Sequence, residues 1–312
     1  MNLNVLVIGG TYFVGRVFAL AASRKEDITL TLLNRGRYSL GRDSVREIRC
    51  DRHDEKGLRA ALGKTTWDAV VDFCAYEPGD IEMILHLPGF RTEHYLLMSS
   101  SSVCDVPLSE EKTEESPVLT VGDGTRDGDY AYKKALLEAE LKSACQGIGT
   151  AYTVFRPAFI YGPYNYAERE SWFIQHIAEN RPVPNPVQAT ARFQFVYVGD
   201  VAEAILLCLT DRRARNQIFH LAGPEVLDYP AFFRALEACS DRPVRYENVT
   251  AQDIVRRSIP MPYPIFRDDL CSGKRITEKL GFQYRPFLEG MGKTWNAFLR
   301  VYDSAPPSSG SP

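Results

Sequence analysis

The sequence predicts an α/β protein in which a doubly wound parallel sheet is interleaved with a smaller C-terminal portion. In the first half, short runs of β-branched and apolar residues alternate with stretches of helical periodicity, and this alternation is typical of parallel strands joined by helices. After Pro163 the sequence becomes irregular and rich in proline, notably at residues 181–186 and 259–264. Proline at this density excludes central strands and helix interiors there.

We expect six strands in the first half and a seventh that returns to the sheet from the second half. The predicted strands are residues 4–8, 28–33, 45–50, 69–73, 94–98, 151–155 and, returning, 217–222. The clearest predicted helices are residues 14–23, 130–144 and 201–210. The middle helix is rich in Ala, Leu, Glu and Lys, and Gly147 stands just beyond its predicted end.

These elements divide the chain into two interleaved portions and a tail. The sheet domain is predicted to comprise residues 1–162 plus about 198–224, and the second portion about 163–197 plus 225–302. Residues 303–312, rich in Ser and Pro, are predicted to be disordered.

Composition argues against several classes of protein. The net charge of −3 gives no electrostatic signature of nucleic-acid binding. The first apolar run is too short for a signal peptide or a membrane span. Seven cysteines without a C-x-x-C spacing, and five histidines without metal-ligand spacing, indicate a reduced cytoplasmic protein that binds no metal.

A glycine-rich turn follows the first predicted strand. The residues after this strand are Gly9-Gly10-Thr11-Tyr12-Phe13-Val14-Gly15, and a helix follows, which is the order that a dinucleotide-binding turn requires. Glycine permits the tight turn and the close packing of helix on strand, while the helix N-terminus offers N–H donors to a pyrophosphate. We therefore expect all seven residues to bind a dinucleotide, with a plain strand-to-helix turn as the competing interpretation.

The end of the second strand bears on the choice of dinucleotide. It reads Asn34-Arg35-Gly36-Arg37, without the acidic residue that holds the ribose 2′-hydroxyl of NAD. Arg35, with or without Arg37, is suited to pair with a 2′-phosphate, so NADP is favoured over NAD. The competing interpretation is that both arginines are solvated loop residues.

Tyr130 and Lys134 lie four residues apart in the predicted central helix, hence on one face. A nearby ammonium favours the phenolate, so we expect Lys134 to lower the pKa of Tyr130 and Tyr130 to act as acid or base toward a substrate oxygen. Serines 99–102 follow the fifth strand, at the carboxyl edge of the sheet where α/β proteins bind ligands. Taken together, these groups predict a catalytic site.

Residues 3–300 resemble the extended short-chain dehydrogenases/reductases, the NAD(P)-dependent sugar-nucleotide epimerase/dehydratase family. The matching features are the glycine turn, Ser99-Ser100 before Val103, Tyr130/Lys134 with Glu138, Phe155-Arg156-Pro157, Tyr161-Gly162-Pro163 and residues 195–202. The resemblance implies a Rossmann-type sheet with a substrate-binding cap, a Ser100, Tyr130 and Lys134 triad, and a homodimer. It also adds Asn34, Asp51, Cys74, Ala75, Pro157 and Ile160 to the expected cofactor-binding residues.

The resemblance has two notable departures. Tyr12 occupies the middle glycine position of the family turn, where a side chain obstructs the pyrophosphate unless it points away. Ser101-Ser102 replace the Asp-Glu pair that family dehydratases use to eliminate water. Epimerisation or ketone reduction of a nucleotide-linked sugar is therefore expected rather than elimination, with hydride transfer to or from a nicotinamide.

Four residues are the expected substrate contacts by resemblance, and a rival function remains open. The contacts are Ser101, Asn165, Arg192 and Arg267. For the two arginines, surface salt bridges are the competing interpretation, and for Asn165 it is an ordinary turn residue. The turn and the 34–36 segment resemble an atypical branch that includes the chloroplast stem-loop-binding proteins, so the alternative is an RNA-binding or regulatory protein.

Overall fold

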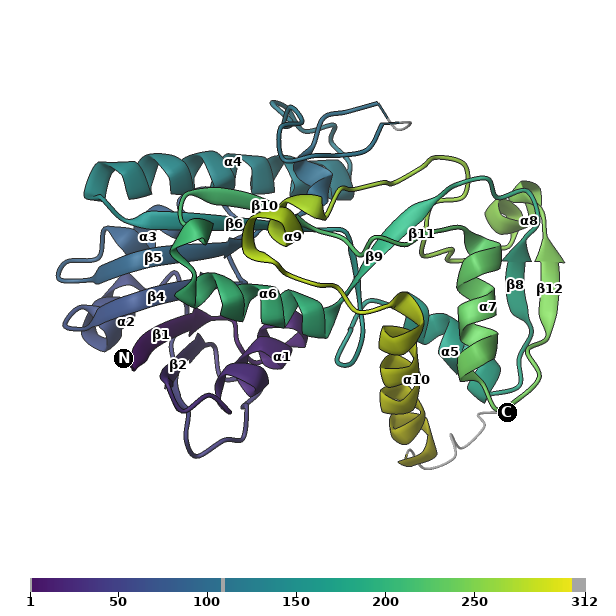
Figure 1. The fold of residues 1–312 in the computed structure, drawn as a ribbon, viewed down its shortest axis with the longest axis horizontal. Helices are drawn as coiled ribbons and strands as arrows, with labels where there is room; N and C mark the ends of the chain where they lie inside the picture. Colours follow the sequence, from purple (N-terminus) through teal and green to yellow (C-terminus); the bar gives the residue numbers. More distant parts are fainter. Residues whose placement is uncertain (1, 108–109, 305–312) are drawn as a thin grey trace.

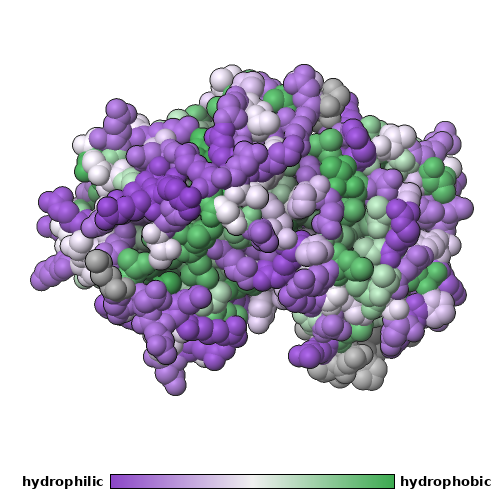
Figure 2. All heavy atoms as spheres, in the orientation of Figure 1, coloured by the Kyte–Doolittle hydropathy of each residue, from purple (hydrophilic) through white to green (hydrophobic). Residues whose placement is uncertain are grey.

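The chain folds into two parts with different architectures, shown on the left and right of Figure 1. The structure is a computed structural model, and it describes residues 2–107 and 110–304. The left part contains a large parallel sheet between two layers of helices, and the right part contains short strands and the helices that surround them. Figure 2 shows the two parts separated by a notch at the lower edge, with hydrophilic residues over most of this face.

The large sheet has seven parallel strands in the order β10-β6-β5-β4-β1-β2-β3. Its strands are β1 (Leu3–Ile8), β2 (Ile28–Asn34), β3 (Arg46–Arg49), β4 (Thr66–Asp72), β5 (Arg91–Met98), β6 (Ala151–Pro157) and β10 (Gln217–Leu221). Chain order runs outward in both directions from β1, so a crevice opens at the carboxyl edge between β1 and β4. The predicted doubly wound, Rossmann-type sheet is confirmed, including the strand that returns from the second half.

Helices cover both faces of this sheet because alternate strand residues point to opposite sides. Val5 and Val7 pack with α1 (Phe13–Ala22), α6 (Val198–Thr210) and α9 (Lys274–Leu280). Leu6 and Ile8 pack on the other face with three further helices, α2 (Glu55–Leu62), α3 (Asp80–Leu85) and α4 (Arg126–Ile148).

Helix α4 is longer at both ends than its sequence pattern predicts. The Thr125 side chain accepts a hydrogen bond from the Gly128 N–H, which caps the helix well before Tyr130. At the other end, Gly149 adopts a left-handed conformation with φ 72° and ends the helix. Gly147, which we expected to lie beyond the helix, is inside it. Tyr130 consequently lies in the second turn rather than at the helix start.

The second part is built around aromatic side chains. It holds a sheet ordered β11-β9-β7 and a pair, β12-β8. Its elements are β7 (Phe159–Tyr161), β8 (Val183–Pro186), β9 (Phe193–Tyr197), β11 (Val226–Leu227), β12 (Tyr246–Val249), α5 (Glu170–Ala178), α7 (Tyr229–Cys239), α8 (Ala251–Arg256) and α10 (Phe287–Ser304). Phe173, Phe193, Phe195, Phe232 and Tyr263 are nearly inaccessible to solvent in its core.

The two parts interleave more deeply than the predicted boundaries. Helix α9 lies within the range expected for the second portion, yet its Ile276 and Leu280 pack into the core of the large sheet. The proline-rich segment 183–186 forms β8, which pairs with β12 in a separate small sheet, so its prolines interrupt no central strand. Of the predicted disordered tail, residues 303 and 304 belong to α10, and residues 305–312 lie outside the described part of the chain.

Candidate active site

The turn after β1 has a shape that only glycine permits at two positions. A Cβ on Gly9, whose φ is +86°, would lie 2.0 Å from the Cys74 Sγ, and one on Gly15 would lie 2.3 Å from the Gly9 carbonyl oxygen. Helix α1 therefore begins directly against the turn. No side chain in the described part of the chain caps its first N–H groups, and free N–H groups at a helix N-terminus are suited to a phosphate. The turn fits the pyrophosphate of a dinucleotide.

The side chain of Tyr12 is held by two other tyrosine rings. Its ring is half exposed and stacks between Tyr38, at a centroid distance of 5.5 Å, and Tyr166, at 4.9 Å. The neighbouring Thr11, Phe13 and Val14 are buried. The side chain that replaces the family glycine is thus held in an aromatic stack.

The ribose side of the turn carries exposed arginines. The Asn34 side chain is engaged locally, because its Oδ1 accepts a hydrogen bond from the Gly36 N–H at 2.7 Å. Arg35 is exposed, and no carboxylate among the described residues lies within ion-pair distance of it. Arg49, which the sequence analysis did not single out, packs its side chain against Gly36. Arg35 and Arg49 thus flank the loop where a 2′-phosphate is expected.

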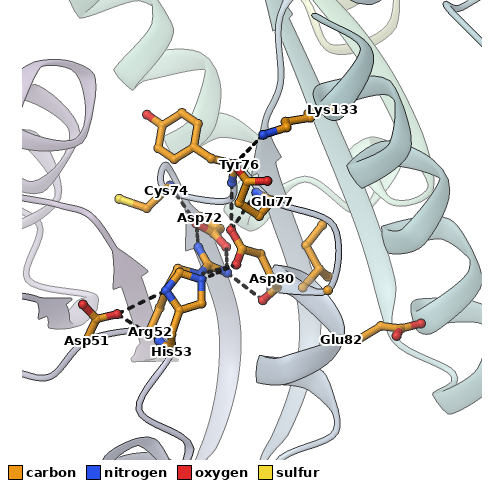
Figure 3. A network of polar contacts seen from close by, with 12 residues as sticks. Asp51, Arg52, His53, Asp72, Cys74, Tyr76, Glu77, Asp80, Glu82 and Lys133 are labelled. Atoms are coloured by element: carbon orange, nitrogen blue, oxygen red, sulfur yellow. Dashed lines mark hydrogen bonds and ion pairs between the residues drawn. The ribbon is translucent and has the colours of Figure 1, made fainter. Parts of the chain in front are cut away.

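A buried ionic network supports the loop after β4, as Figure 3 shows. The Arg52 guanidinium donates to both carboxylate oxygens of Asp72 at 3.1 Å and to the Asp80 carbonyl oxygen at 2.6 Å. Asp72 accepts a hydrogen bond from the Cys74 N–H at 2.8 Å, and Asp80 accepts one from the Tyr76 N–H at 2.8 Å. The two carboxylates therefore fix the backbone of residues 74–76.

Lys134 is the best-defined charged group of the site. Its side chain is 2% exposed, and its Nζ donates to the Ala75 carbonyl oxygen at 2.7 Å and to the Met98 carbonyl oxygen at 3.0 Å. The centroid of the Tyr76 ring lies 4.6 Å from the Nζ, a cation–π contact. Burial lowers the pKa of Lys134 to about 8. The amine is thus held between the carboxyl ends of β4 and β5.

Tyr130 lies one turn before Lys134, with its ring centroid 5.9 Å from the Nζ. The structure corrects the expected direction of its pKa: although the residue is 40% exposed, partial desolvation of the phenol, and secondarily the neighbouring Tyr166 hydroxyl, raise the pKa of Tyr130 to about 12. Desolvation of the phenol outweighs the opposing attraction of Arg169, while the hydrogen bonds of the Lys134 ammonium go to backbone carbonyls.

Serines at the end of β5 connect helix α4 to the sheet. The Ser99 hydroxyl donates to Glu138 Oε1 at 2.6 Å, and Arg156 donates to both oxygens of Glu138 at 2.9 and 2.6 Å. Ser100 accepts a hydrogen bond from the Ser102 N–H at 3.2 Å, and the two hydroxyl oxygens lie 2.7 Å apart. This contact begins the 3₁₀ turn η1 (Ser101–Val103). Ser100 and Lys134 thus share one edge of the sheet.

The remaining predicted residues fall into two groups. The first group lies on the side of the large sheet that carries the other candidates: Ala75 comes just after β4, Pro157 ends β6, and Ile160 lies within β7. Asp51 follows β3 and accepts a hydrogen bond from the His53 N–H at 3.0 Å.

Two of the four expected substrate contacts are occupied by internal partners. The Asn165 amide donates to both Glu170 oxygens, at 3.0 and 3.1 Å. Arg192 donates twice to Asp268 Oδ2, at 3.0 and 2.6 Å. In this conformation neither side chain has these donors free for a substrate, and both assignments stay predictions. Arg267 is exposed and Ser101 is buried beside Ser100, and both stay candidates.

Two groups near Tyr130 were missed by the sequence analysis. The ring of Tyr76 covers Lys134. The one signal in the sequence is that Tyr76 lies two residues after Cys74, which was an expected cofactor-binding residue. Arg169 is half-buried, and its guanidinium carbon lies 5.4 Å from the centroid of the Phe159 ring. Among the described residues no carboxylate lies within ion-pair distance of Arg169. The positive charge of Arg169 lowers the pKa of Tyr130, against the larger effect of desolvation. No motif marks this arginine.

The described residues form neither a metal-ligand cluster nor a membrane-spanning helix. Within residues 2–107 and 110–304, no group of three or more His, Cys, Asp or Glu side chains is arranged to hold a metal ion. No helix in the same described ranges is long and apolar enough to cross a membrane.

Comparisons with known proteins agree with this architecture. Residues 5–222 match the sequence model of the NAD dependent epimerase/dehydratase family. The chain is 28% identical over 247 residues to the chloroplast stem-loop binding protein of 41 kDa b of Arabidopsis thaliana, covering 74% of this chain and 62% of that protein. It is 23% identical over 260 residues to 2′-dehydrokanamycin reductase of Streptomyces kanamyceticus, covering 80% of this chain and 70% of the reductase.

Solved structures share the fold at lower identity. The UDP-glucuronic acid 4-epimerase of Bacillus cereus, solved in complex with UDP-glucuronic acid and NAD, superimposes with a TM-score of 0.74 at 14% identity. The match covers 96% of this chain and all of that one. Because the family match spans more than half of the sequence, this chain belongs to the NAD dependent epimerase/dehydratase family.

Proposed function

We propose that this chain is a nicotinamide-dependent epimerase or ketoreductase that acts on a nucleotide-linked sugar. The observation that carries the proposal is Lys134. A buried ammonium is costly unless it is paired, yet the contacts of Lys134 are two backbone carbonyls and an aromatic ring. A titratable group kept in such surroundings, one helical turn from a phenol, supports a catalytic role.

The residues of this chain fit a nicotinamide dinucleotide. The turn from Gly9 to Gly15 and the N-terminus of α1 would hold its pyrophosphate, and Lys134 its ribose. We further propose NADP over NAD, because Arg35 is exposed, forms no ion pair with a carboxylate among the described residues, and stands where NAD-specific sites carry an acid. When bound, the cofactor supplies a centre that accepts or donates a hydride.

The chain's own part in the reaction is to move and stabilise a proton. With a pKa raised to about 12, the Tyr130 phenol is protonated at neutral pH and can donate to the oxygen of a ketone. In the opposite direction the phenolate form of Tyr130 accepts the proton of a hydroxyl group, and the Lys134 ammonium would stabilise that phenolate. The Ser100 hydroxyl would hydrogen-bond the same oxygen. Ser101 and Ser102, in place of an Asp-Glu pair, supply no acid and base for elimination.

The similar proteins support both reactions that remain open. One is named as an epimerase of UDP-glucuronic acid and another as a reductase. The similarity to a stem-loop binding protein does not favour RNA binding here, because this chain has a net charge of −3 and retains Tyr130 and Lys134.

The test begins with the cofactor. Purified protein is denatured and the supernatant is assayed for NAD and NADP, and the folded protein is then titrated with NADH and NADPH. We expect at least one to bind, with NADPH the tighter. If neither binds, the proposal is overturned.

The second step compares two neighbouring phenols, with UDP-glucose, UDP-glucuronic acid and UDP-N-acetylglucosamine as probe substrates. Tyr130→Phe should lower turnover about 10²–10⁴-fold and leave cofactor binding intact. Tyr132→Phe, which removes a hydroxyl from the same helix, should change turnover little. Full activity of Tyr130→Phe would refute the assignment, and salt-sensitive RNA affinity that ignores this substitution would favour the rival function.

A further inference from the structure

Three exposed tyrosines form one continuous stack beside the glycine turn. Tyr38, Tyr12 and Tyr166 are 57%, 48% and 61% exposed. The Tyr12 ring lies 5.5 Å from Tyr38 with an interplanar angle of 8°, and 4.9 Å from Tyr166 with an angle of 22°. Exposed aromatic side chains far apart in sequence meet in this way only if the segments that carry them are held together. We call these three residues the tyrosine cover.

The tyrosine cover joins three segments of the site. Tyr12 immediately precedes the first residue of α1, Tyr38 lies in the loop between β2 and β3, and Tyr166 lies between β7 and α5, in the second part of the molecule. The edge of Phe13 also meets the Tyr166 ring, with centroids 5.9 Å apart and an interplanar angle of 88°. The stack therefore bridges the cofactor-binding part and the second part.

Arg16 makes a second set of contacts between the same three segments. Its Nη1 donates to the Ser39 carbonyl oxygen at 3.0 Å, and its guanidinium lies 5.2 Å from the centroid of the Tyr164 ring. Helix α1, the β2–β3 loop and the segment after β7 are thus joined by two independent sets of contacts.

The tyrosine cover also reaches the catalytic helix. After burial, the Tyr166 hydroxyl makes the next largest contribution to the raised pKa of Tyr130. Tyr166 also contributes to the raised pKa of Tyr76, after burial and Cys74. One end of the stack therefore lies near the catalytic phenol, its middle lies at the phosphate-binding turn, and its other end lies on the ribose-side loop.

We propose that the tyrosine cover closes over a bound nicotinamide dinucleotide and retains it between turnovers. This inference rests on the proposed function, since it requires the cofactor to occupy the glycine turn. Tyr12 belongs to the turn that would hold the pyrophosphate, and its ring is stacked on Tyr38 from the β2–β3 loop and on Tyr166 from the second part. In this proposal the dinucleotide leaves only when Tyr12 separates from a neighbour. Because the rings are half exposed, they can separate without opening a core.

Retention also favours one of the two reactions. An epimerase returns its cofactor to the starting oxidation state within each turnover, so it has no need to release it. A ketoreductase consumes one equivalent of reduced cofactor per turnover and must exchange it. A cover that slows exchange therefore favours epimerisation.

Release is measured directly. Protein loaded with NADPH, or with NADH if that binds more tightly, is mixed with excess oxidised cofactor, and the loss of reduced-nicotinamide fluorescence is followed by stopped flow. We expect release to be about tenfold faster in Tyr12→Ala and in Tyr166→Ala than in the natural chain. Tyr12→Phe and Tyr166→Phe keep the rings, and their release should match that of the natural chain.

Each outcome decides between separate claims. If the alanine variants release the cofactor no faster, or if the phenylalanine variants release it as fast as the alanine variants, the stack does not retain it. If the natural chain binds neither NADH nor NADPH, the proposed function itself fails. Thermal unfolding monitors folding, and Tyr38→Ala, at the outer end of the stack, repeats the test should a substitution at Tyr12 or Tyr166 unfold the protein.

Discussion

Two sides of the same site differ in how deeply their side chains are buried and in the contacts that hold them. On one side, which we call the catalytic wall, Lys134, Glu138, Arg156 and Ser99 are almost fully buried and make hydrogen bonds of 2.6 to 3.0 Å. On the other side, the tyrosine cover consists of half-exposed rings stacked at 4.9 and 5.5 Å.

The difference corresponds to two demands that the proposed reaction would place on the site. Proton transfer requires a phenol and a cation at fixed positions, because a small displacement of a reacting group is costly in rate. Buried charged hydrogen bonds supply such positions, since breaking one leaves an uncompensated charge. Entry and exit of a large cofactor instead require contacts that open at low cost, and exposed aromatic pairs of about 0.5–1.5 kcal/mol meet that requirement. Substitutions should therefore have large effects in the catalytic wall and small effects around the cover.

The largest effect is expected from Lys134→Met. The substitution removes the cation one turn from Tyr130, so we expect turnover to fall about 10²–10⁴-fold. The matched control is Lys133→Met, because Lys133 is the adjacent residue of α4, is 43% exposed and pairs with Glu77 on the surface. Turnover is measured with the probe sugar nucleotides under cofactor saturation. Equal losses in the two variants would show that Lys134 has no special part in turnover.

The next largest effect is expected on stability, when the buried ion pair of Glu138 and Arg156 in the catalytic wall is broken. Glu138→Gln leaves the Arg156 guanidinium buried without a carboxylate, so we expect the free energy of unfolding to fall by about 3–5 kcal/mol. The exposed pair of Lys133 and Glu77 supplies the comparison, and Glu77→Gln should cost at most about 1 kcal/mol. Urea unfolding followed by circular dichroism measures both. A loss below about 1 kcal/mol for Glu138→Gln would show that the buried pair is not needed for stability.

The regularity of the large sheet explains why its strands could be predicted. Its strands carry apolar residues that are buried on both faces, as at Val5 to Ile8, and their ends are marked by turn residues. The glycine turn and the Tyr130/Lys134 pair were also predictable, because their meaning depends on spacing within one local element. The site assignments themselves stay predictions until the variants are measured.

What could not be predicted depends on residues distant in sequence. Nothing local indicates that Tyr12 meets Tyr38 and Tyr166, or that Lys134 bonds to the carbonyls of Ala75 and Met98. The same holds for the expected substrate contact Arg192, whose partner Asp268 follows 76 residues later. The pKa of Tyr130 was expected to fall because of a neighbouring charge, but burial, which sequence does not report, dominates it.

A third prediction uses pH to detect the buried amine of the catalytic wall. Burial lowers the pKa of Lys134 from 10.5 to about 8 in the folded protein. Between these values the unfolded chain binds more protons at this site, so the stability of the natural chain relative to Lys134→Met should rise with pH. We expect a rise of about 2 kcal/mol between about pH 7 and about pH 9.5.

Urea unfolding at both pH values measures this difference. Lys133→Met, whose parent amine is partly exposed, should give the same difference from the natural chain at both. Parallel pH curves for the natural chain and Lys134→Met would contradict the lowered pKa.

The smallest effect is expected beside the tyrosine cover, at Arg35. A charge-assisted hydrogen bond from this exposed guanidinium to a 2′-phosphate contributes about 1.5 kcal/mol, so Arg35→Ala should weaken NADPH binding about tenfold. Binding of NADH, which lacks that phosphate, should change little. Titrations of both coenzymes into the natural chain, Arg35→Ala and Arg37→Ala provide the comparison, since Arg37 is exposed in the same loop. An equal loss of both coenzymes in Arg35→Ala would mean that Arg35 does not distinguish them, and a loss in Arg37→Ala alone would move the 2′-phosphate contact two residues along the loop.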